Sequence, residues 1–337
     1  MQTIITKLQN KQDLTAEESG QMQEQIISGQ LSKEEIVKIF ELFEAKPITN
    51  EELLGIVNAT RKNMVKVDVD FDCLDNCGTG GDKLNTFNIS TVSSIVCASA
   101  GIPMAKHGNR AASSKCGSAD VLEELGVKIE LDAQQAKKCL EDCGIVFMFA
   151  PLFHPALKHV KDARVEYGQK TYFNILGPML NPAGVKHQLI GVSDTDKVEL
   201  IGNTLLETGS QRVVIVCGNE GMDEISIETG TQVFDFKQGK EVDKYEIEPK
   251  DFKLDTYPLE DIKGGDKKEN AEIFLNILSD QAHPAQVNAV LLNSAAAMMA
   301  FGKVGDIQEG IDLAKEQIES GKALAKLKEF IEVSNKL

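Results

Sequence analysis

The chain has 337 residues, of which 42% are hydrophobic and 26% charged, and its formal net charge is −16 at pH 7. A chain of this length buries a large core and has room for two domains, or for one large domain with an appendage. The negative charge, the absence of Trp and an aromatic content of 5% argue against a nucleic-acid partner, which needs a basic surface and aromatic platforms for its bases.

The N-terminal region, to about residue 70, predicts helices only. Thr15 and Glu18 have the spacing of a capping box at the start of one helix, and Ser32 and Glu35 repeat that spacing at the start of the next. A third helix, from about residue 50 to residue 64, has an apolar face. These patterns predict a small helical bundle.

From about residue 71 the pattern changes to short apolar runs that alternate with helical patterns. Three runs are typical of strands: "GIVFMFAP" at 144–151, "HQLIGVSD" at 187–194 and "RVVIVCGN" at 212–219. A hairpin is expected at 231–249, and long helices follow from 270 to 335. The predicted fold class is α/β, with a small all-helical domain and a large domain whose mostly parallel central sheet is flanked by helices. Ligands of such sheets bind at the carboxyl ends of the strands.

A glycine-rich stretch, "CGTGGDKLNTFNIST", occupies residues 77–91. A strand-to-helix turn over 78–81 has few side chains to block it, so several backbone N–H groups can converge on one anion. The following helix, from about Ser90 to Ala100, adds its positive dipole end and the hydroxyls of Ser90 and Thr91. The stretch therefore indicates a phosphate or pyrophosphate site, although a structural turn has the same composition.

A second polar stretch, "KHGNRAASSKCGSADVLEELG", follows at 106–126. Lys106 and Arg110 supply cations, Asn109 is both donor and acceptor, and Ser118 is expected to be the N-cap of a short helix. By itself the stretch is also typical of a solvated basic turn. Two such turns about twenty-five residues apart, each opening a helix, favour binding to two ends of a polyphosphorylated molecule.

Two adjacent acids, Asp223 and Glu224, follow the strand-like run at 212–219 and should lie at the carboxyl end of that strand. Adjacent acids are usually only solvated. Mg²⁺, however, is normally held by one or two carboxylates together with phosphate oxygens and water. Next to a phosphate site, the pair therefore indicates a magnesium site.

Seven cysteines without a CxxC pair indicate reduced thiols rather than a disulfide framework or a zinc site. The N-terminus has no apolar run suited to a signal peptide, and no segment approaches the ~20 apolar residues of a membrane span. We therefore expect a cytoplasmic protein with no membrane partner.

Taken in order, these motifs closely resemble those of the anthranilate phosphoribosyltransferases. The shared stretches are "GTGGD", "TFNIST", "KHGNR..SS..GSADVLE", "FAPLFHPALKHV", "NILGPMLNP" and "GMDEIS", and the resemblance runs from about residue 10 to residue 335. It implies transfer of the phosphoribosyl group of 5-phosphoribosyl-1-diphosphate (PRPP) to the amine of anthranilate, with release of pyrophosphate. This reaction belongs to tryptophan biosynthesis, and Mg²⁺ is the implied cofactor.

The resemblance also implies site residues, position by position. The implied PRPP contacts are Gly78, Gly81, Asp82, Thr86, Asn88, Ile89, Ser90, Thr91, Lys106, His107, Gly108, Asn109, Arg110, Ala111, Ala112, Ser113, Ser114 and Ser118. The implied Mg²⁺ positions are Ser90, Asp223 and Glu224. Anthranilate would contact Gly78, His107, Asn109, His154 and Arg164. Lys106, Asn109 and Arg164 would carry the catalytic roles.

The segment around Arg164 departs from the family pattern, because Val165 and Tyr167 stand where a basic or polar residue and a leucine are usual. The arginine itself stays in register, and its guanidinium is suited to binding both oxygens of the anthranilate carboxylate. A plain surface arginine is the alternative. His107 and His154 are expected to line the acceptor path, or else to be packed histidines.

The resemblance further implies a helical domain of residues 1–71 with 160–186, a large domain of 72–159 with 187–337, and a homodimer formed through the helical domain. Association with an anthranilate synthase stays open. A pyrimidine nucleoside phosphorylase is an alternative with a similar fold, but its second signature differs from "GSADVLE". A non-catalytic, nucleic-acid-binding paralogue is another alternative, disfavoured by the net charge and the intact motifs.

Overall fold

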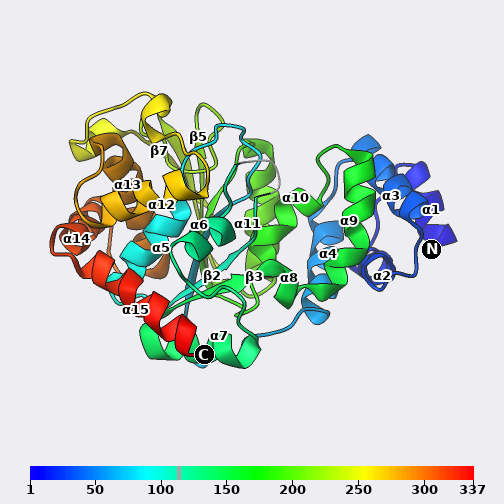
Figure 1. The fold of residues 1–337 in the computed structure, drawn as a ribbon. Coiled ribbons are helices and arrows are strands. Elements are labelled where there is room, and N and C mark those ends of the chain that lie inside the picture. Colours follow the sequence, from blue (N-terminus) through cyan, green and yellow to red (C-terminus); the bar gives the residue numbers. More distant parts are fainter. Residues whose placement is uncertain (112–114) are drawn as a thin grey trace.

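The computed structural model describes residues 1–111 and 115–337. Ala112, Ser113 and Ser114, which the sequence assigns to the PRPP site, lie outside the described residues. A small helical part and a larger α/β part lie side by side, with the N-terminus in the former and the C-terminus in the latter (Figure 1). The predicted fold class is confirmed.

The helical part begins with α1 (Gln2–Gln9), α2 (Ala16–Ile27), α3 (Lys33–Ala45) and α4 (Asn50–Lys62). The two predicted capping boxes are present at Thr15 and Ser32, and a third lies at Thr49. In each box the hydroxyl accepts a hydrogen bond from the amide three residues later, and the glutamate there accepts one from the cap amide. Each cap contributes about 1 kcal/mol, because it satisfies amides that the helix itself leaves without a partner.

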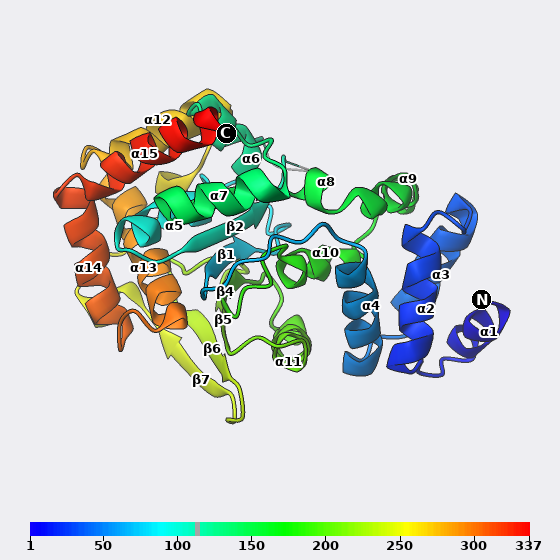
Figure 2. The same ribbon diagram turned by 90° about the horizontal axis from the view of Figure 1, so that it is seen from below.

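A later segment of the chain returns to these helices. It comprises α8 (Ala150–Phe153), α9 (Lys158–Tyr167) and α10 (Phe173–Leu176), with short 3₁₀ turns at Pro155–Leu157 and Gly177–Leu180. Helix α9 packs against α2 and α3, as both views of the ribbon show (Figures 1 and 2). The Tyr172 hydroxyl donates a hydrogen bond of 3.1 Å to Gln23, and Lys33 forms an ion pair with Glu166. The domain limits at 160 and 186 stay a prediction.

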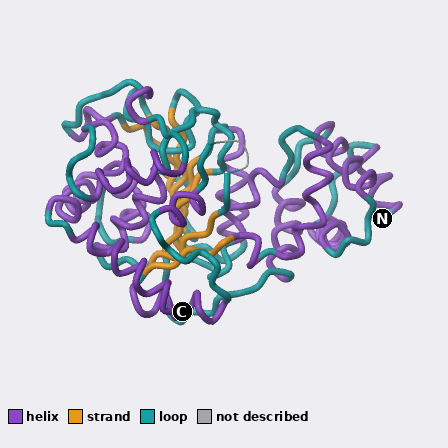
Figure 3. Tube along the Cα trace, in the orientation of Figure 1, coloured by secondary structure: helices purple, strands orange, loops and turns teal. Residues whose placement is uncertain are grey.

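The α/β part is built on one seven-stranded sheet in the order β3-β2-β1-β4-β5-β6-β7. The strands are β1 (Leu74–Gly78), β2 (Met104–Gly108), β3 (Ile145–Phe149), β4 (His187–Gly191), β5 (Arg212–Gly218), β6 (Thr231–Lys237) and β7 (Asp243–Ile247). Strands β1 to β5 pair in parallel, whereas β6 and β7 form the expected antiparallel hairpin. In Figure 3 the strands form a central layer between helices.

The covering helices are α5 (Ile89–Ser99), α6 (Ser118–Glu124), α7 (Ala133–Cys143), α11 (Val198–Glu207), α12 (Lys267–Leu278), α13 (Pro284–Phe301), α14 (Ile307–Glu319) and α15 (Lys322–Lys336). Helix α13 is apolar on every side and packs against α5, α14 and the sheet, so nearly all of its residues are buried. Over the described residues, no helix combines the length and apolar character needed to cross a membrane.

Two apolar cores hold the molecule together. One lies on the α5 and α13 side of the sheet. The other runs from the N-terminal helices across α10 and α11 to Ile190 and Ile215 on the sheet, so the helical part shares its core with the α/β part. Arg61 of α4 also joins them, because its guanidinium donates hydrogen bonds to the backbone oxygens of Met179 (2.7 Å) and Thr208 (3.0 Å).

The strand order positions the site. From β1 the chain proceeds outward through β2 to β3, and then returns to place β4 on the opposite side of β1. Such a reversal leaves a crevice outside the carboxyl ends of the two central strands. Gly78 ends β1 and pairs with Gly191, which ends β4. The glycine-rich stretch therefore begins in this crevice.

Candidate active site

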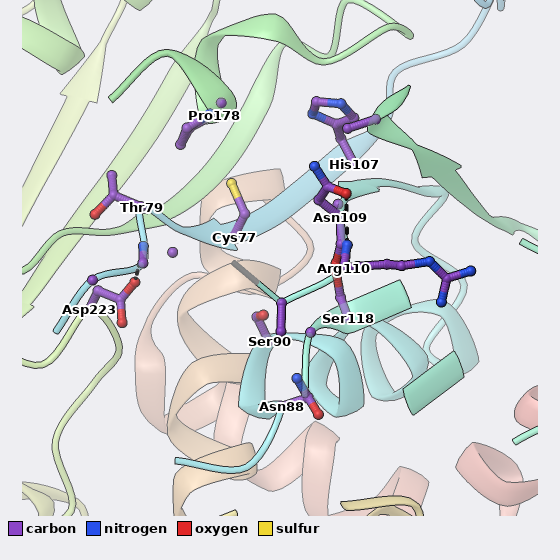
Figure 4. Close-up of a pocket in the computed structure, with 18 of the residues that line it drawn as sticks. Cys77, Thr79, Asn88, Ser90, His107, Asn109, Arg110, Ser118, Pro178 and Asp223 are labelled. Carbon is purple, nitrogen blue, oxygen red and sulfur yellow. Dashed lines mark hydrogen bonds between the residues drawn. The ribbon is translucent and has the colours of Figure 1, made fainter. Parts of the chain in front are cut away.

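A cavity of about 750 Å³ lies at the carboxyl ends of β1 and β2 and extends to the segment that contains α8, α9 and α10. All predicted site residues in the described part of the chain line it: Gly78, Gly81, Asp82, Thr86, Asn88, Ile89, Ser90, Thr91, Lys106, His107, Gly108, Asn109, Arg110, Ala111, Ser118, His154, Arg164, Asp223 and Glu224. In Figure 4, His107 and Asn109 lie on one side of the opening, Thr79 and Asp223 lie on the other, and Cys77 lies between them.

The glycine loop follows β1 and leads into α5, as the sequence predicts. Gly80 and Gly81 have φ values of +73° and +82°, the left-handed region that side-chain-bearing residues rarely adopt. The Gly80 amide donates a hydrogen bond of 2.6 Å to Asp223 Oδ2 (Figure 4), and the Thr79 amide donates one of 2.9 Å to the Gly191 oxygen. Strand β4, through Gly191, and the segment that contains Asp223 thus hold the loop in place.

The two glycines that end β1 and β4 are required by a close approach of the chain. A Cβ atom at Gly78 would lie 2.1 Å from Asp223 Oδ2, and one at Gly191 would lie 1.6 Å from the Asp223 backbone oxygen. Contacts this short are not tolerated between non-bonded atoms, so any side chain at Gly191 must change the position of Asp223 relative to β4. The absence of side chains at these two positions therefore lets the acidic residue reach the glycine loop.

The acids Asp223 and Glu224 lie against the glycine loop and the N-terminus of α5. Burial, followed by repulsion from Asp82, raises the pKa of Asp223. Burial, followed by repulsion from Asp223, raises the pKa of Glu224, although the charge of Lys106 opposes this shift. Burial and repulsion thus disfavour the charged forms of both acids, which a bound cation would favour.

This donor set fits Mg²⁺. Oxygen donors from carboxylates and a hydroxyl are the ligands that Mg²⁺ prefers, and a cation would relieve the repulsion between the acids. Across the described residues, no group of three or more His, Cys, Asp or Glu side chains is arranged to hold a metal ion unaided. The arrangement therefore matches an ion held by one or two carboxylates together with a phosphorylated substrate, rather than a protein cage.

Lys106 is buried beneath the N-terminus of α5, with 3% of its surface exposed. Its ammonium group donates a hydrogen bond of 2.6 Å to the backbone oxygen of Asn76 and a longer one of 3.4 Å to the Ser90 hydroxyl. Asn76 in turn donates from its side chain to the Ser90 backbone oxygen at 2.9 Å. Lys106 therefore places a positive charge next to the hydroxyl that is predicted to face the metal ion.

Ser118 is not the N-cap of α6, contrary to the expectation from the sequence. The helix begins at Ser118, and Gly117 is the N-cap. The carboxylate of Asp120 accepts the hydrogen bond from the Gly117 amide, and the Ser118 hydroxyl donates to the Asn109 backbone oxygen at 3.3 Å. An Asp at the third helical position takes the place of the Glu or Gln of a usual capping box.

The acceptor end of the cavity combines two histidines. Their rings meet edge to face, with centroids 5.0 Å apart. Burial lowers the pKa of His107 to about 3 and that of His154 to about 4, so both are neutral at pH 7. The Leu180 carbonyl opposes the shift at His154, yet no described group meets hydrogen-bond geometry with either ring nitrogen. His154 thus has unused hydrogen-bonding capacity at the cavity wall.

Arg164 lies on α9, and its guanidinium carbon is 5.7 Å from the centre of the Phe173 ring. Its side chain is exposed and forms no ion pair with any residue in the described segments. The neighbouring wall is apolar, a feature that the sequence did not assign to the site; it is formed by Leu157, Phe173, Leu176, Pro178 and Leu180. An arginine beside an apolar, aromatic wall suits a flat ligand that carries a carboxylate.

Comparisons with known proteins agree with this geometry. Residues 70–324 match the family model "Glycosyl transferase family, a/b domain". The chain is 44% identical to the anthranilate phosphoribosyltransferase of Methanobrevibacter smithii over 98% of both chains, and 43% identical to that of Persephonella marina over 97% of both.

Solved structures extend the similarity to the whole fold. The Thermus thermophilus anthranilate phosphoribosyltransferase superposes with a TM-score of 0.91 at 32% identity, covering 98% of this chain and 99% of that one. The Saccharomyces cerevisiae enzyme in complex with PRPP and Mg also gives a TM-score of 0.91, at 28% identity, covering 99% of this chain and 98% of that one. On its sequence, its fold and the residues gathered in its cavity, this chain belongs to the anthranilate phosphoribosyltransferase family.

Proposed function

We propose that this chain transfers the 5-phosphoribosyl group of PRPP to the amine of anthranilate, giving N-(5-phosphoribosyl)anthranilate and pyrophosphate. The observation that carries the proposal is the division of one cavity into two unlike halves. One half has the glycine loop, hydroxyls and two half-buried acids, and the other has an apolar wall, two neutral histidines and an exposed arginine. The first suits a phosphorylated sugar, and the second suits an aromatic acid.

The PRPP half uses backbone amides more than cationic side chains. The positive φ values of Gly80 and Gly81 give the loop a tight turn in which backbone N–H groups can converge on one anion, and α5 adds the positive end of its dipole. Lys106 stabilises the negative charge that develops on the leaving pyrophosphate. A well-placed donor of this kind typically contributes about 3–4 kcal/mol to the transition state. The residues of the second stretch, including those at 112–114, complete the proposed site.

We assign Mg²⁺ to Ser90, Asp223 and Glu224, because these groups bring hard oxygen donors to the glycine loop. When bound, the ion neutralises charge on the pyrophosphate group. The chain itself orients this ligand set: Lys106 holds the Ser90 hydroxyl, and the Gly80 amide holds Asp223. The metal complex of the yeast relative supports the assignment for this chain.

In the acceptor half, Arg164 is proposed to bind the carboxylate of anthranilate, and Asn109 with the apolar wall orients its ring. The aromatic amine is neutral at pH 7, so the reaction needs no strong base. His107 and His154 are neutral as well and act as hydrogen-bonding groups rather than as charges. Positioning therefore contributes more than proton abstraction.

Three assignments at a larger scale belong to the same proposal. Residues 1–71 with 160–186 form the helical domain, supported by the packing of α9 on α2 and α3, and a homodimer forms through this domain. The reaction takes place in the cytoplasm, where the seven free cysteines stay reduced. Association with an anthranilate synthase would supply the acceptor directly, and co-elution of the two proteins tests it.

The proposed function is tested by incubating the purified chain with anthranilate and PRPP, with and without Mg²⁺, and measuring the product by mass. A parallel reaction contains thymidine and phosphate. We expect N-(5-phosphoribosyl)anthranilate only when Mg²⁺ is present, and no thymine. Release of thymine without the expected product would instead assign the chain to the pyrimidine nucleoside phosphorylases.

A further inference from the structure

The loop between β2 and α6 is closed at its base by one carboxylate. Oδ2 of Asp120 accepts hydrogen bonds from the amides of Ala111, at 3.0 Å, and Gly117, at 2.9 Å. These two amides lie on opposite sides of the loop. Asp120 therefore joins the outgoing chain to the returning chain with two charge-assisted hydrogen bonds.

We call the closed base of the loop, formed by Ala111, Gly117 and Asp120, its neck. The two sides of the loop also touch directly there. A Cβ atom at Gly117 would lie 2.4 Å from the Ala111 nitrogen, so only glycine permits the approach. The Asn109 backbone oxygen accepts a hydrogen bond from the Ala119 amide at 3.2 Å, next to the one from the Ser118 hydroxyl. The neck thus fixes the backbone of Asn109.

Arg110 reinforces the neck from outside. Its guanidinium donates hydrogen bonds to Asp120 at 3.1 Å and to Glu123 at 2.7 and 3.0 Å. In Figure 4 the Arg110 side chain extends away from Ser90 and Asp223. These ion pairs are largely exposed and contribute little by themselves. The two hydrogen bonds that Asp120 accepts from backbone amides are the stronger contacts. Together with these ion pairs they form what we call the Asp120 clamp.

We infer that Asp120 is a positioning residue for PRPP, which acts by closing the neck of this loop and so fixing Asn109 and the amides beside it. The inference rests on the proposed function, because it takes Asn109 and Ala111 as PRPP contacts. Asp120 acts on PRPP only through these residues, by holding the two sides of the loop together. Arg110 acts with Asp120 rather than through a direct contact of its guanidinium with the substrate.

The inference is tested with Asp120→Asn in the full chain. An amide keeps the shape of the carboxylate but removes its charge: its oxygen can still accept from the amides of Ala111 and Gly117, while its NH₂ group takes the place of the oxygen that faces the Arg110 guanidinium. We expect the Kd for PRPP, measured by titration calorimetry with Mg²⁺, and the KM for PRPP to rise on the order of 10- to 100-fold, the loss expected when two hydrogen bonds to a charged group become hydrogen bonds to a neutral one. The KM for anthranilate should change less than about threefold, because Arg164 lies on another element.

A second variant opens the same neck without changing charge. Gly117→Ala inserts a Cβ atom against Ala111 and should raise the Kd for PRPP in the same way. Glu123→Gln is the matched control, because it removes an ion pair of Arg110 and leaves the hydrogen bonds of Asp120 in place. We expect this control to bind PRPP within about threefold of the wild type.

The outcomes distinguish a role of Asp120 in PRPP binding from a role in stability alone, and they test this role separately from the proposed function. A purely structural role would lower the melting temperature but leave the Kd of the folded protein unchanged, and this result overturns the inference. Unchanged PRPP binding by both Asp120→Asn and Gly117→Ala also overturns it. A wild-type chain that binds PRPP but makes no product refutes the proposed function while the binding data still decide the clamp. A wild-type chain that does not bind PRPP refutes both.

Discussion

Gly191 provides the sharpest test of how the fold builds the site, although it does not itself line the cavity. In Gly191→Ala the new Cβ atom would lie 1.6 Å from the Asp223 backbone oxygen, whereas ordinary contact begins at 3.4 Å. Either strand β4 or the segment that contains Asp223 must therefore move by nearly 2 Å. Overpacking of this kind typically costs about 1–3 kcal/mol of stability.

The effect on activity should exceed the effect on stability. Catalytic groups must be held within about 0.5 Å of their productive positions, and a misplacement of about 1 Å typically costs on the order of 100-fold. We therefore expect kcat/KM for PRPP to fall at least about 100-fold in Gly191→Ala, at saturating anthranilate and Mg²⁺. The melting temperature, measured by circular dichroism, should fall by only a few degrees.

Gly305→Ala is the matched control for this substitution. Gly305 precedes α14 and is not among the residues that line the cavity, and the nearest atom to its Cβ position is a flexible carboxylate oxygen of Glu309 at 3.3 Å. We expect wild-type kinetics from this variant. If Gly191→Ala also shows wild-type kinetics, then the position of Asp223 does not depend on the close approach, and the reasoning is refuted.

Three further variants test the remaining groups. The double variant Asp223→Asn with Glu224→Gln should abolish the rise in melting temperature that Mg²⁺ causes together with PRPP. Burial raises the pKa of both acids, so this rise should be larger for the wild type at pH 8 than at pH 6. Equal rises in melting temperature at the two pH values would contradict the metal assignment. Arg164→Ala should raise the KM for anthranilate about 10- to 100-fold, and a selective rise for PRPP would contradict its role. His154 has a lowered pKa, so the unfolded chain binds its proton first, and stability should fall as pH drops from about 6.5 towards 4. Urea unfolding at pH 7 and pH 5 should show His154→Asn losing less stability than the wild type, by about 2 kcal/mol, and equal losses would refute the assignment.

Local signals in the sequence predicted local structure well. The capping boxes at Thr15 and Ser32, the hairpin and the parallel strands all follow from short-range chemistry or from periodicity, and the structure confirms them. The cap of α6 was predicted wrongly, because Ser118 is a good N-cap residue by type. Gly117 takes the cap position instead, where the Asp120 carboxylate accepts the hydrogen bond of its amide.

Relations between distant segments were not predictable in this way. Gly191 gives no signal of its own, since its role depends on Asp223 passing over the end of β4. The apolar wall around Phe173 reads in the sequence as ordinary core, and its place at the cavity depends on how the segment after β3 packs on the helical part. The neck of the loop after β2 likewise depends on tertiary contacts. Sequence motifs identified the chemistry, while the geometry that orients it came from the fold.

The most direct test of the central claim is a crystal structure of this chain with PRPP, Mg²⁺ and an anthranilate analogue that lacks the amine. We expect the pyrophosphate group on the glycine loop, Mg²⁺ in contact with Ser90 and at least one of Asp223 and Glu224, and the analogue's carboxylate on Arg164. PRPP bound outside the cavity, or the aromatic acid bound away from Arg164 and the apolar wall, would contradict the division of the cavity into a phosphate half and an acceptor half.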